Sequence, residues 1–370
     1  MPRRIAAACL LAVSLAASVL VGTQPARSCT SIRMKTSDGA VIYARTMEFA
    51  NFKSGVAVVP KGYKYQGTLP DGSSKGLKWA VKYGFVGMNV EGVPVVTDGM
   101  NEKGLVVGSL YIPGYVKYQP YTPLKASSTI AQFEVNTWLL STCATVEDVR
   151  KAMATVRVCQ GPMQPTGGAI PLHFTVHDAS GKSLVVEYVD GQLKLHDNPI
   201  GVLTNSPNFD WMLTNLSNYV NLSPDNANGM TVAGVNILPF SQGSGLLGLP
   251  GDFTSPSRFV RMVALSQSTE PVKSADEGVS LAMTVINNVD IPIGAVRQKT
   301  DTGVVLEVTD WTVVADLANK RYFFRTYANK NWQQVNLAKA LAGAKTAMTI
   351  SIDAPADYPE ISGQAKPIAP

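Results

Sequence analysis

CTSIRMKTSDGAVIYARTME, residues 29–48, is the stretch of sequence that decides the fold. Its two apolar-rich runs, residues 30–34 and 40–44, are separated by Ser37-Asp38-Gly39. Ser, Asp and Gly are residues that favour a tight turn between two antiparallel strands. The stretch therefore predicts a β-hairpin that begins directly after Cys29.

Runs of strands, then helices, then strands again follow this hairpin, which favours an α+β fold with antiparallel sheets over alternating βαβ units. We expect strands at residues 56–59, 95–97, 105–110, 173–177 and 184–188, and a closing antiparallel meander at 304–308, 311–316 and 321–326. We expect helices at residues 128–140, 146–154 and 274–288, and after Ser206-Pro207 and Ser255-Pro256, each pair being interpreted as an N-cap followed by the first helical residue.

The sequence shows no internal repeat and no linker within the body of the chain. We therefore expect residues 29–352 to form a single domain. Residues 353–370 are Pro-rich and weakly apolar, which predicts a loose tail.

The first 28 residues have the pattern of a secretory signal peptide. Two arginines precede an uncharged, largely apolar run over residues 5–21, and Ala26-Arg27-Ser28 places small residues three and one before Cys29. A transmembrane anchor is the alternative, but the run is short for a bilayer span and a cleavage pattern follows it. The chain is thus expected to be exported, to a periplasm or the outside, without a stable membrane anchor.

Composition excludes several classes of function. The formal net charge is +5 over 370 residues, and no Lys- or Arg-rich block gives the footprint of a nucleic-acid binder. The chain has three histidines, and His173 and His177 fall on one face of a predicted strand. A metal site there is an alternative, but ordinary strand residues are favoured because no zinc-spaced cluster joins them. Since phosphate-loop and G-x-S-x-G motifs are also missing, we expect neither cofactor nor metal.

Cys29 is the odd cysteine once the predicted signal is removed. Cys143 and Cys159 can pair in an oxidising compartment. Cleavage before Cys29 would give this residue a free α-amine with an ordinary pKa of about 7.7–8.0, a base tethered to its own thiol. The alternatives are a buried or disulfide-bonded cysteine, or the lipid-bearing first residue of a lipoprotein, whose signal pattern Ala26 and Arg27 fit poorly.

Cys29 is the first residue of a series of motifs that follow one another along the chain. They are Cys29-Thr30, Tyr43-Ala44-Arg45-Thr46-Met47-Glu48, Asp98-Gly99-Met100-Asn101-Glu102-Lys103-Gly104-Leu105, Ile112-Pro113-Gly114-Tyr115, Gly201-Val202-Leu203-Thr204-Asn205-Ser206-Pro207 and Gly248-Leu249-Pro250-Gly251-Asp252-Phe253-Thr254, followed by Ser257-Arg258-Phe259. From Cys29 to about residue 328 the chain resembles the choloylglycine hydrolase family, the bile salt hydrolases and penicillin V acylases among the N-terminal nucleophile (Ntn) hydrolases. The resemblance implies a four-layer αββα sandwich of two antiparallel sheets.

The family's functional positions carry over residue by residue. The nucleophile falls on Cys29, the arginine near the thiol on Arg45, its next polar partner on Glu48, the oxyanion-side residue on Tyr111, the oxyanion asparagine on Asn205 and the supporting arginine on Arg258. Glu48 departs from the pattern, because the family usually has aspartate there. Arg45 beside the thiol would favour the thiolate, and Met47 and Phe49 are expected to line an apolar acyl pocket.

The resemblance implies hydrolysis of a small-molecule linear amide next to a bulky apolar acyl group. Tyr111 favours penicillin V over a bile salt as substrate, and an N-acyl homoserine lactone acylase of the same family is an alternative. A homotetramer is the assembly that the resemblance implies. The alternative from another class is a non-enzymatic envelope protein that is lipid-anchored or disulfide-bonded.

Overall fold

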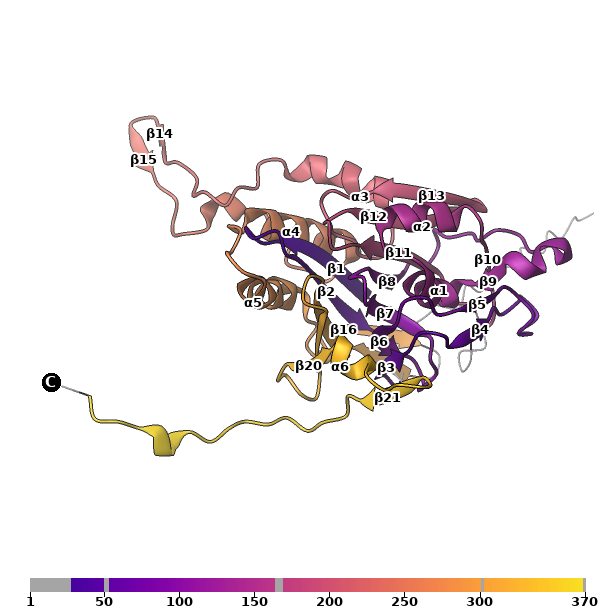
Figure 1. Ribbon diagram of the computed structural model, residues 1–370. Coiled ribbons are helices and arrows are strands. Elements are labelled where there is room, and N and C mark those ends of the chain that lie inside the picture. Colours follow the sequence, from indigo (N-terminus) through magenta and orange to yellow (C-terminus); the bar gives the residue numbers. More distant parts are fainter. Residues whose placement is uncertain (1–27, 50–52, 164–168, 301–302, 369–370) are drawn as a thin grey trace, which may run out of the picture.

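A computed structural model describes residues 28–49, 53–163, 169–300 and 303–368. Two antiparallel sheets face each other, and helices pack on their outer faces (Figure 1). The predicted four-layer αββα sandwich is confirmed. Except for Ser28, the predicted export signal lies outside the described residues.

The smaller sheet carries the predicted hairpin. Its five strands, in order, are β1 (Ser28–Lys35), β2 (Val41–Glu48), β18 (Trp311–Asp316), β19 (Arg321–Thr326) and β20 (Gln333–Asn336). In the register of β1 and β2, Ser28 lies opposite Glu48 and Cys29 lies opposite Met47. The hairpin therefore brings both ends of the deciding stretch to one edge of the sandwich.

The larger sheet contains the middle of the chain and one strand from near its end. Its eight strands, in order, are β13 (Gln192–Asp197), β12 (Ser183–Val189), β11 (Leu172–His177), β8 (Val106–Tyr111), β7 (Val96–Asn101), β6 (Phe85–Asn89), β3 (Gly55–Val59) and β21 (Met348–Ser351). Strand β8 contacts β1 across the interface between the sheets. The carboxyl end of β8, at Tyr111, thereby lies close to Cys29.

Helices cover both sheets. They are α1 (Val135–Thr142), α2 (Val146–Met153), α3 (Phe209–Asn215), α4 (Ser255–Ser268), α5 (Ala275–Ile286) and α6 (Leu337–Leu341). Helices α4 and α5 pack on the smaller sheet and α1 packs on the larger one. The side chain of Thr145 caps α2 by accepting from Asp148 N, and that of Ser274 caps α5 by accepting from Glu277 N. In the described part of the chain, no helix is both long and apolar enough to span a bilayer.

The helix expected at residues 128–140 forms only in its second half. Residues 129–131 are instead strand β9 (Thr129–Ala131), which pairs in parallel with β10 (Arg157–Cys159). The carbonyl of Thr129 also accepts from Leu77 N, so the backbone of this segment is engaged by distant strands and is not available for helical bonds. The α-helix consequently begins at Val135.

The two Ser-Pro pairs behave differently from expectation. Ser206 Oγ donates to the carbonyl of Pro113, so it does not cap a helix, and α3 begins only at Phe209. The Ser206–Pro207 peptide bond is cis. Ser255 is the first residue of α4, whose N-cap is Thr254, and the Ser255 hydroxyl accepts from Asn205 N. Arg258 is therefore the fourth residue of that helix.

The closing meander also differs from expectation. Strand β17 (Gly303–Glu307) pairs with β16 (Val296–Thr300) in a separate two-stranded sheet, and β20 completes the meander instead. Two further pairs are β4 (Lys64–Gln66) with β5 (Lys78–Ala80), and β14 (Met230–Val232) with β15 (Val235–Ile237). The β14–β15 hairpin projects from the body, and residues 353–368 run away from it on another side (Figure 1).

Cys143 and Cys159 are both buried free thiols. Cys143 directly follows α1, and Cys159 ends β10. The disulfide that the sequence allows between them is therefore not formed.

Candidate active site

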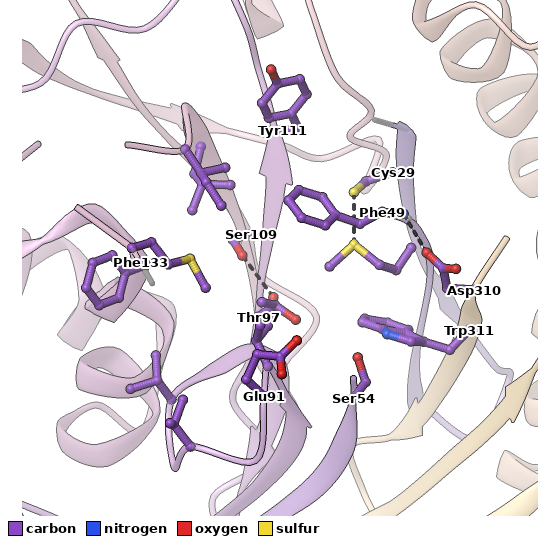
Figure 2. A pocket seen from close by; sticks show the side chains of 17 residues that line it. Cys29, Phe49, Ser54, Glu91, Thr97, Ser109, Tyr111, Phe133, Asp310 and Trp311 are labelled. Carbon is purple, nitrogen blue, oxygen red and sulfur yellow. Dashed lines mark hydrogen bonds between the residues drawn. The ribbon is translucent and has the colours of Figure 1, made fainter. Parts of the chain in front are cut away.

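Cys29 lies in the wall of a mostly apolar cavity and is 2% exposed. Figure 2 shows Cys29 and Tyr111 toward one end of the cavity and Ser54 and Glu91 toward the other. The cavity has a volume of about 1000 Å³, its open mouth included. Its apolar lining is formed by Met47, Phe49, Val90, Val93, Val95, Phe133, Met163, Ile170, Leu172 and Trp311.

Strand alternation brings Arg45 and Met47 to the thiol. Met47 pairs with Cys29 across the hairpin, and Arg45, two residues earlier, faces the same side of β2. Arg45 Nη2 lies 3.6 Å from Cys29 Sγ, and Met47 Sδ lies 3.7 Å from it. The Arg45 guanidinium also lies over the Trp311 ring, 5.0 Å from its centroid. A fully buried cation is thus fixed beside the sulfur.

The environment of the thiol has opposing effects on its protonation. Burial raises the pKa of Cys29 and is the largest effect; the charge of Arg45 lowers it, and that of Glu48 raises it. The backbone N–H of Tyr111 and the charge of Arg258 lower it further, but the net direction is upward. The charge of Arg45 therefore favours the thiolate but does not offset the effect of burial on the pKa of Cys29.

Asn205 and Arg258 hold the backbone of Cys29. The nitrogen of Cys29 donates to Asn205 Oδ1 at 2.9 Å, and Arg258 Nη1 donates to the Cys29 carbonyl at 2.6 Å. Asn205 Nδ2 donates to the carbonyl of Tyr111 at 2.7 Å, which leaves its second N–H available. Two predicted residues that are 53 positions apart in the chain are thus brought together at Cys29.

Glu48, a predicted catalytic residue, acts on Cys29 through its charge. It is 1% exposed, and its Oε1 accepts from Thr309 Oγ1 at 2.8 Å. Burial raises its pKa to about 8, although Arg258 and the hydroxyls of Thr309 and Thr46 favour the ionised form. Within the described residues, no hydrogen bond joins Glu48 to the thiol or nitrogen of Cys29. It lies beside Ser28 instead.

Asp98, a buried residue of the opposite sheet that was not among the predicted site residues, lies beside Arg45. Asp98, on β7, accepts from Tyr43 Oη at 2.6 Å and from Tyr322 Oη at 2.7 Å, and its Oδ2 lies 3.7 Å from Arg45 Nη1. A Cβ at Gly108 would lie 2.5 Å from Tyr43 Oη, so the close approach requires glycine there. Asp98 belongs to one of the quoted motifs, but only the packing of two sheets reveals its partners.

The two strand histidines have ordinary partners. His173 lies 2.9 Å from Glu187 Oε1 and 2.8 Å from the carbonyl oxygen of Thr204. His177 lies between the hydroxyls of Thr175 and Ser183. Among the described residues, no group of three or more His, Cys, Asp or Glu side chains is placed to hold a metal ion.

The whole arrangement agrees with one known family. A buried cysteine with a neighbouring cation, a fixed amide and an apolar cavity can bind an acyl group and attack its carbonyl. Residues 29–348 match the profile of the linear amide C–N hydrolases, choloylglycine hydrolase family. The chain belongs to the choloylglycine hydrolase family. It is therefore a hydrolase of linear amides, and the resemblance inferred from its motifs is confirmed.

Relatives in the family act on different amides. The chain is 31% identical to the bile salt hydrolase/transferase of Clostridium perfringens over 84% of its own length and 93% of the relative's. It is 28% identical to the penicillin V acylase of Pectobacterium atrosepticum over 80% of its own length and 77% of the relative's. A crystal structure of the conjugated bile acid hydrolase of C. perfringens superposes with a TM-score of 0.79 at 28% identity, covering 90% of this chain and 100% of that one.

Proposed function

We propose that this choloylglycine hydrolase family member is an N-terminal cysteine amidase whose nucleophile is Cys29 and whose base is the α-amine of Cys29. The observation that carries the proposal is the set of contacts around Cys29. Its sulfur faces an apolar cavity 3.6 Å from Arg45 Nη2, and its nitrogen lies 2.9 Å from an Asn205 oxygen that Arg258 also holds. The amine requires removal of residues 1–28, which fits the predicted export signal.

The proposed reaction begins with transfer of the thiol proton to the α-amine. Arg45 stabilises the resulting thiolate, which attacks the amide carbonyl. The oxyanion accepts from the second N–H of Asn205 and from the backbone N–H of Tyr111, which already faces the sulfur. The α-ammonium returns its proton to the leaving nitrogen, and water then hydrolyses the acyl-thioester while the amine again acts as base.

The cavity favours an acyl group that is bulky, apolar and uncharged. No Lys, Arg or His is present among the described residues that line it. Its acidic side chains are Glu91 and Asp310, and burial raises the pKa of Asp310 to about 6. Any anionic group of the substrate therefore belongs on the amine side of the scissile bond. The phenoxyacetyl group of penicillin V and the steroid of a conjugated bile salt both meet this condition.

We propose penicillin V as the first candidate substrate, because Tyr111 occupies the oxyanion-side position. Tyr111 is 3% exposed and lines the cavity next to Cys29. A conjugated bile salt is the second candidate, and an N-acyl homoserine lactone the third. All three join an apolar acyl group to an amide nitrogen, so the cavity alone does not separate them.

A screen of these three substrates with the processed protein tests the proposal. We expect measurable kcat/KM on at least one of them and loss of nearly all turnover in Cys29→Ser, which folds normally but is a far poorer nucleophile. Retention of more than about a tenth of the wild-type kcat in Cys29→Ser would remove Cys29 as the nucleophile.

The intact mass of the exported protein tests its processing. A mature chain that begins with an unmodified Cys29 supports both export and the tethered base. A diacylglyceryl adduct on Cys29 would support the lipid-anchored alternative and contradict the mechanism, because the thioether formed at the sulfur would leave no thiol to act as the nucleophile.

We also propose that the protein assembles with copies of itself, the homotetramer being the form that the family resemblance implies. The supporting observation is the projecting β14–β15 hairpin, in which Met230, Val235 and Ile237 are exposed, followed by a fully exposed Phe240. Such a concentration of exposed apolar side chains marks an interaction surface. Mass photometry should show tetramers that Phe240→Asp weakens, and a wild-type monomer would contradict the proposal.

A further inference from the structure

Strand β17 buries an acidic side chain, Glu307, and exposes two apolar ones. Val304 is 56% exposed and Leu306 is 40% exposed, whereas Glu307 at the end of the strand is 5% exposed. Burying a carboxylate is unfavourable unless hydrogen bonds or an opposite charge compensate it. Since the strand exposes Val304 and Leu306 but buries Glu307, a specific partner for this carboxyl group is expected.

The contacts of Glu307 lead to the bond that precedes Cys29. Ser28 Oγ donates to Glu307 Oε2 at 3.5 Å, and Ser28 is itself only 8% exposed. The other oxygen, Glu307 Oε1, is buried and has no hydrogen-bond partner among the described residues. On the other side, Glu48 lies opposite Ser28 in the β1–β2 register. Ser28 is thus flanked by two buried carboxylates.

These carboxylates lack a close cation in the unprocessed chain. Within the described ranges, neither Glu48 nor Glu307 forms an ion pair. Arg258 acts on both through its charge, but its guanidinium donates to Cys29 O, Thr30 Oγ1, Asn205 Oδ1 and Phe253 O. One oxygen of each carboxyl group, Glu48 Oε2 and Glu307 Oε1, is therefore buried without a hydrogen-bond donor among the described residues.

Removal of Ser28 would create the missing cation at this place. The nitrogen of Cys29 is now an amide with one N–H, which Asn205 Oδ1 accepts. As an ammonium it would have three N–H donors, and two of them would need new acceptors. The space that Ser28 leaves lies between Glu48 and Glu307, whose oxygens can accept them.

We propose that Glu307 is a positioning residue that binds the α-ammonium of Cys29 together with Glu48 once Ser28 has been removed. The inference rests on the proposed function, because it concerns the amine that acts there as the base. Transfer of the thiol proton to the amine makes a thiolate and an ammonium. Arg45 stabilises the first, and the two carboxylates stabilise the second.

The ionisation of the amine is the direct readout, since a merely structural role would leave it unchanged. The groups that face the amine are the Cys29 thiol, Arg45 and Glu48 on β2, Glu307 on β17 and Arg258 on α4, with Asp310 next to Glu307. Removing the negative charge of Glu307 lowers the pKa of a neighbouring ammonium. Titration of the processed protein labelled with [13C]cysteine, followed by NMR, reports this pKa without any substrate.

We expect the pKa of the Cys29 amine to fall by about one unit in Glu307→Gln and by less in Glu307→Asp, which keeps the charge. With a substrate of the family, kcat should fall about tenfold in Glu307→Gln while KM stays within about twofold. Glu134→Gln is the matched control, because Glu134 is also 5% exposed but accepts from Thr68 and Ala131. Its amine pKa and kcat should equal those of the wild type.

An amine pKa in Glu307→Gln within about 0.2 units of the wild type, or an equal fall in Glu134→Gln, would overturn the proposal. If Glu307→Gln does not fold, Glu307→Asp takes its place, with a smaller downward shift as the required result. Failure of the proposed function is seen separately, as turnover that survives Cys29→Ser or as a mature chain that does not begin at Cys29. A shifted pKa in a protein without turnover on any amide would leave the role of Glu307 intact.

Discussion

Arg258 Nη2 donates to Asn205 Oδ1 at 2.6 Å, and this bond decides which way the Asn205 amide faces. A guanidinium has no acceptor, so the oxygen of the amide must point toward it. The amide nitrogen then points toward Tyr111, where an oxyanion would form beside Cys29. Arg258 therefore contributes to the site by orienting the neutral amide of Asn205 and the backbone of Cys29.

The oxyanion role proposed for Asn205 predicts a defect in turnover. Asn205→Ala should lower kcat about 10²–10³-fold, because one donor to the developing negative charge is lost. KM should change much less, since that donor acts mainly in the transition state. Steady-state kinetics on the best of the three substrates provides the measurement. A fall in kcat of less than about threefold would show that the amide does not serve the oxyanion.

The hydrogen bonds from Tyr43 and Tyr322 to Asp98 are expected to stabilise the fold. Tyr322→Phe removes one of two hydroxyl donors to a fully buried carboxylate and should lower the free energy of unfolding by about 1–3 kcal/mol. Urea denaturation at constant pH measures this change. Tyr65→Phe is a suitable control, because the hydroxyl of Tyr65 donates to the backbone carbonyl of Pro94 and not to Asp98. An equal or larger loss of unfolding free energy in Tyr65→Phe would contradict a special role for the hydrogen bonds to Asp98.

The raised pKa of Glu48 predicts a pH dependence of stability in the unprocessed chain. Burial raises the pKa from its ordinary value of 4.5 to about 8, so the folded protein holds a proton that the unfolded chain releases. The associated stability is present below about pH 4.5 and is lost as the pH rises to about 8. Glu48→Gln should therefore flatten the decline in unfolding free energy between pH 5 and pH 8 in urea titrations. Parallel curves for the two proteins would show that Glu48 is ionised throughout.

Replacing Glu48 with aspartate, the usual family residue, tests whether the longer glutamate side chain takes part in turnover. Glu48→Gln should lower kcat with little change in KM, and Glu48→Asp should keep partial activity because Arg45 and Met47 remain in the family pattern. The comparison is made by steady-state kinetics on processed proteins. If Glu48→Gln keeps kcat within about twofold of the wild type, a difference of about 0.4 kcal/mol, Glu48 has no part in turnover.

Local pattern was sufficient for the hairpin and for part of the site. The turn Ser37-Asp38-Gly39 fixes the register, and strand alternation then places Arg45 and Met47 on the same face as Cys29. The motifs identified Tyr111, Asn205 and Arg258, which the fold brings together at the same cysteine. All these residues could be predicted, because each lies either in a short-range strand pattern or in one of the motifs.

The remaining features depend on contacts between distant segments. Residues 129–131 have a helical pattern but pair with β10, and β17 is drawn into a separate pair with β16. Asp98 meets its two tyrosines only because the sheets face each other, and Glu307 lies beside Ser28 from 279 positions away. No periodicity in the sequence encodes such long-range partners.

The most direct test of the central claim compares two forms of the same chain. One begins at Cys29, and the other keeps Ser28 in front of it, with both N-termini established by intact mass. In the second form the nitrogen of Cys29 is an amide, which is not a base at neutral pH. We predict turnover on the best of the three substrates for the first form and almost none for the second. Full activity of the form that retains Ser28 would contradict the tethered-base mechanism.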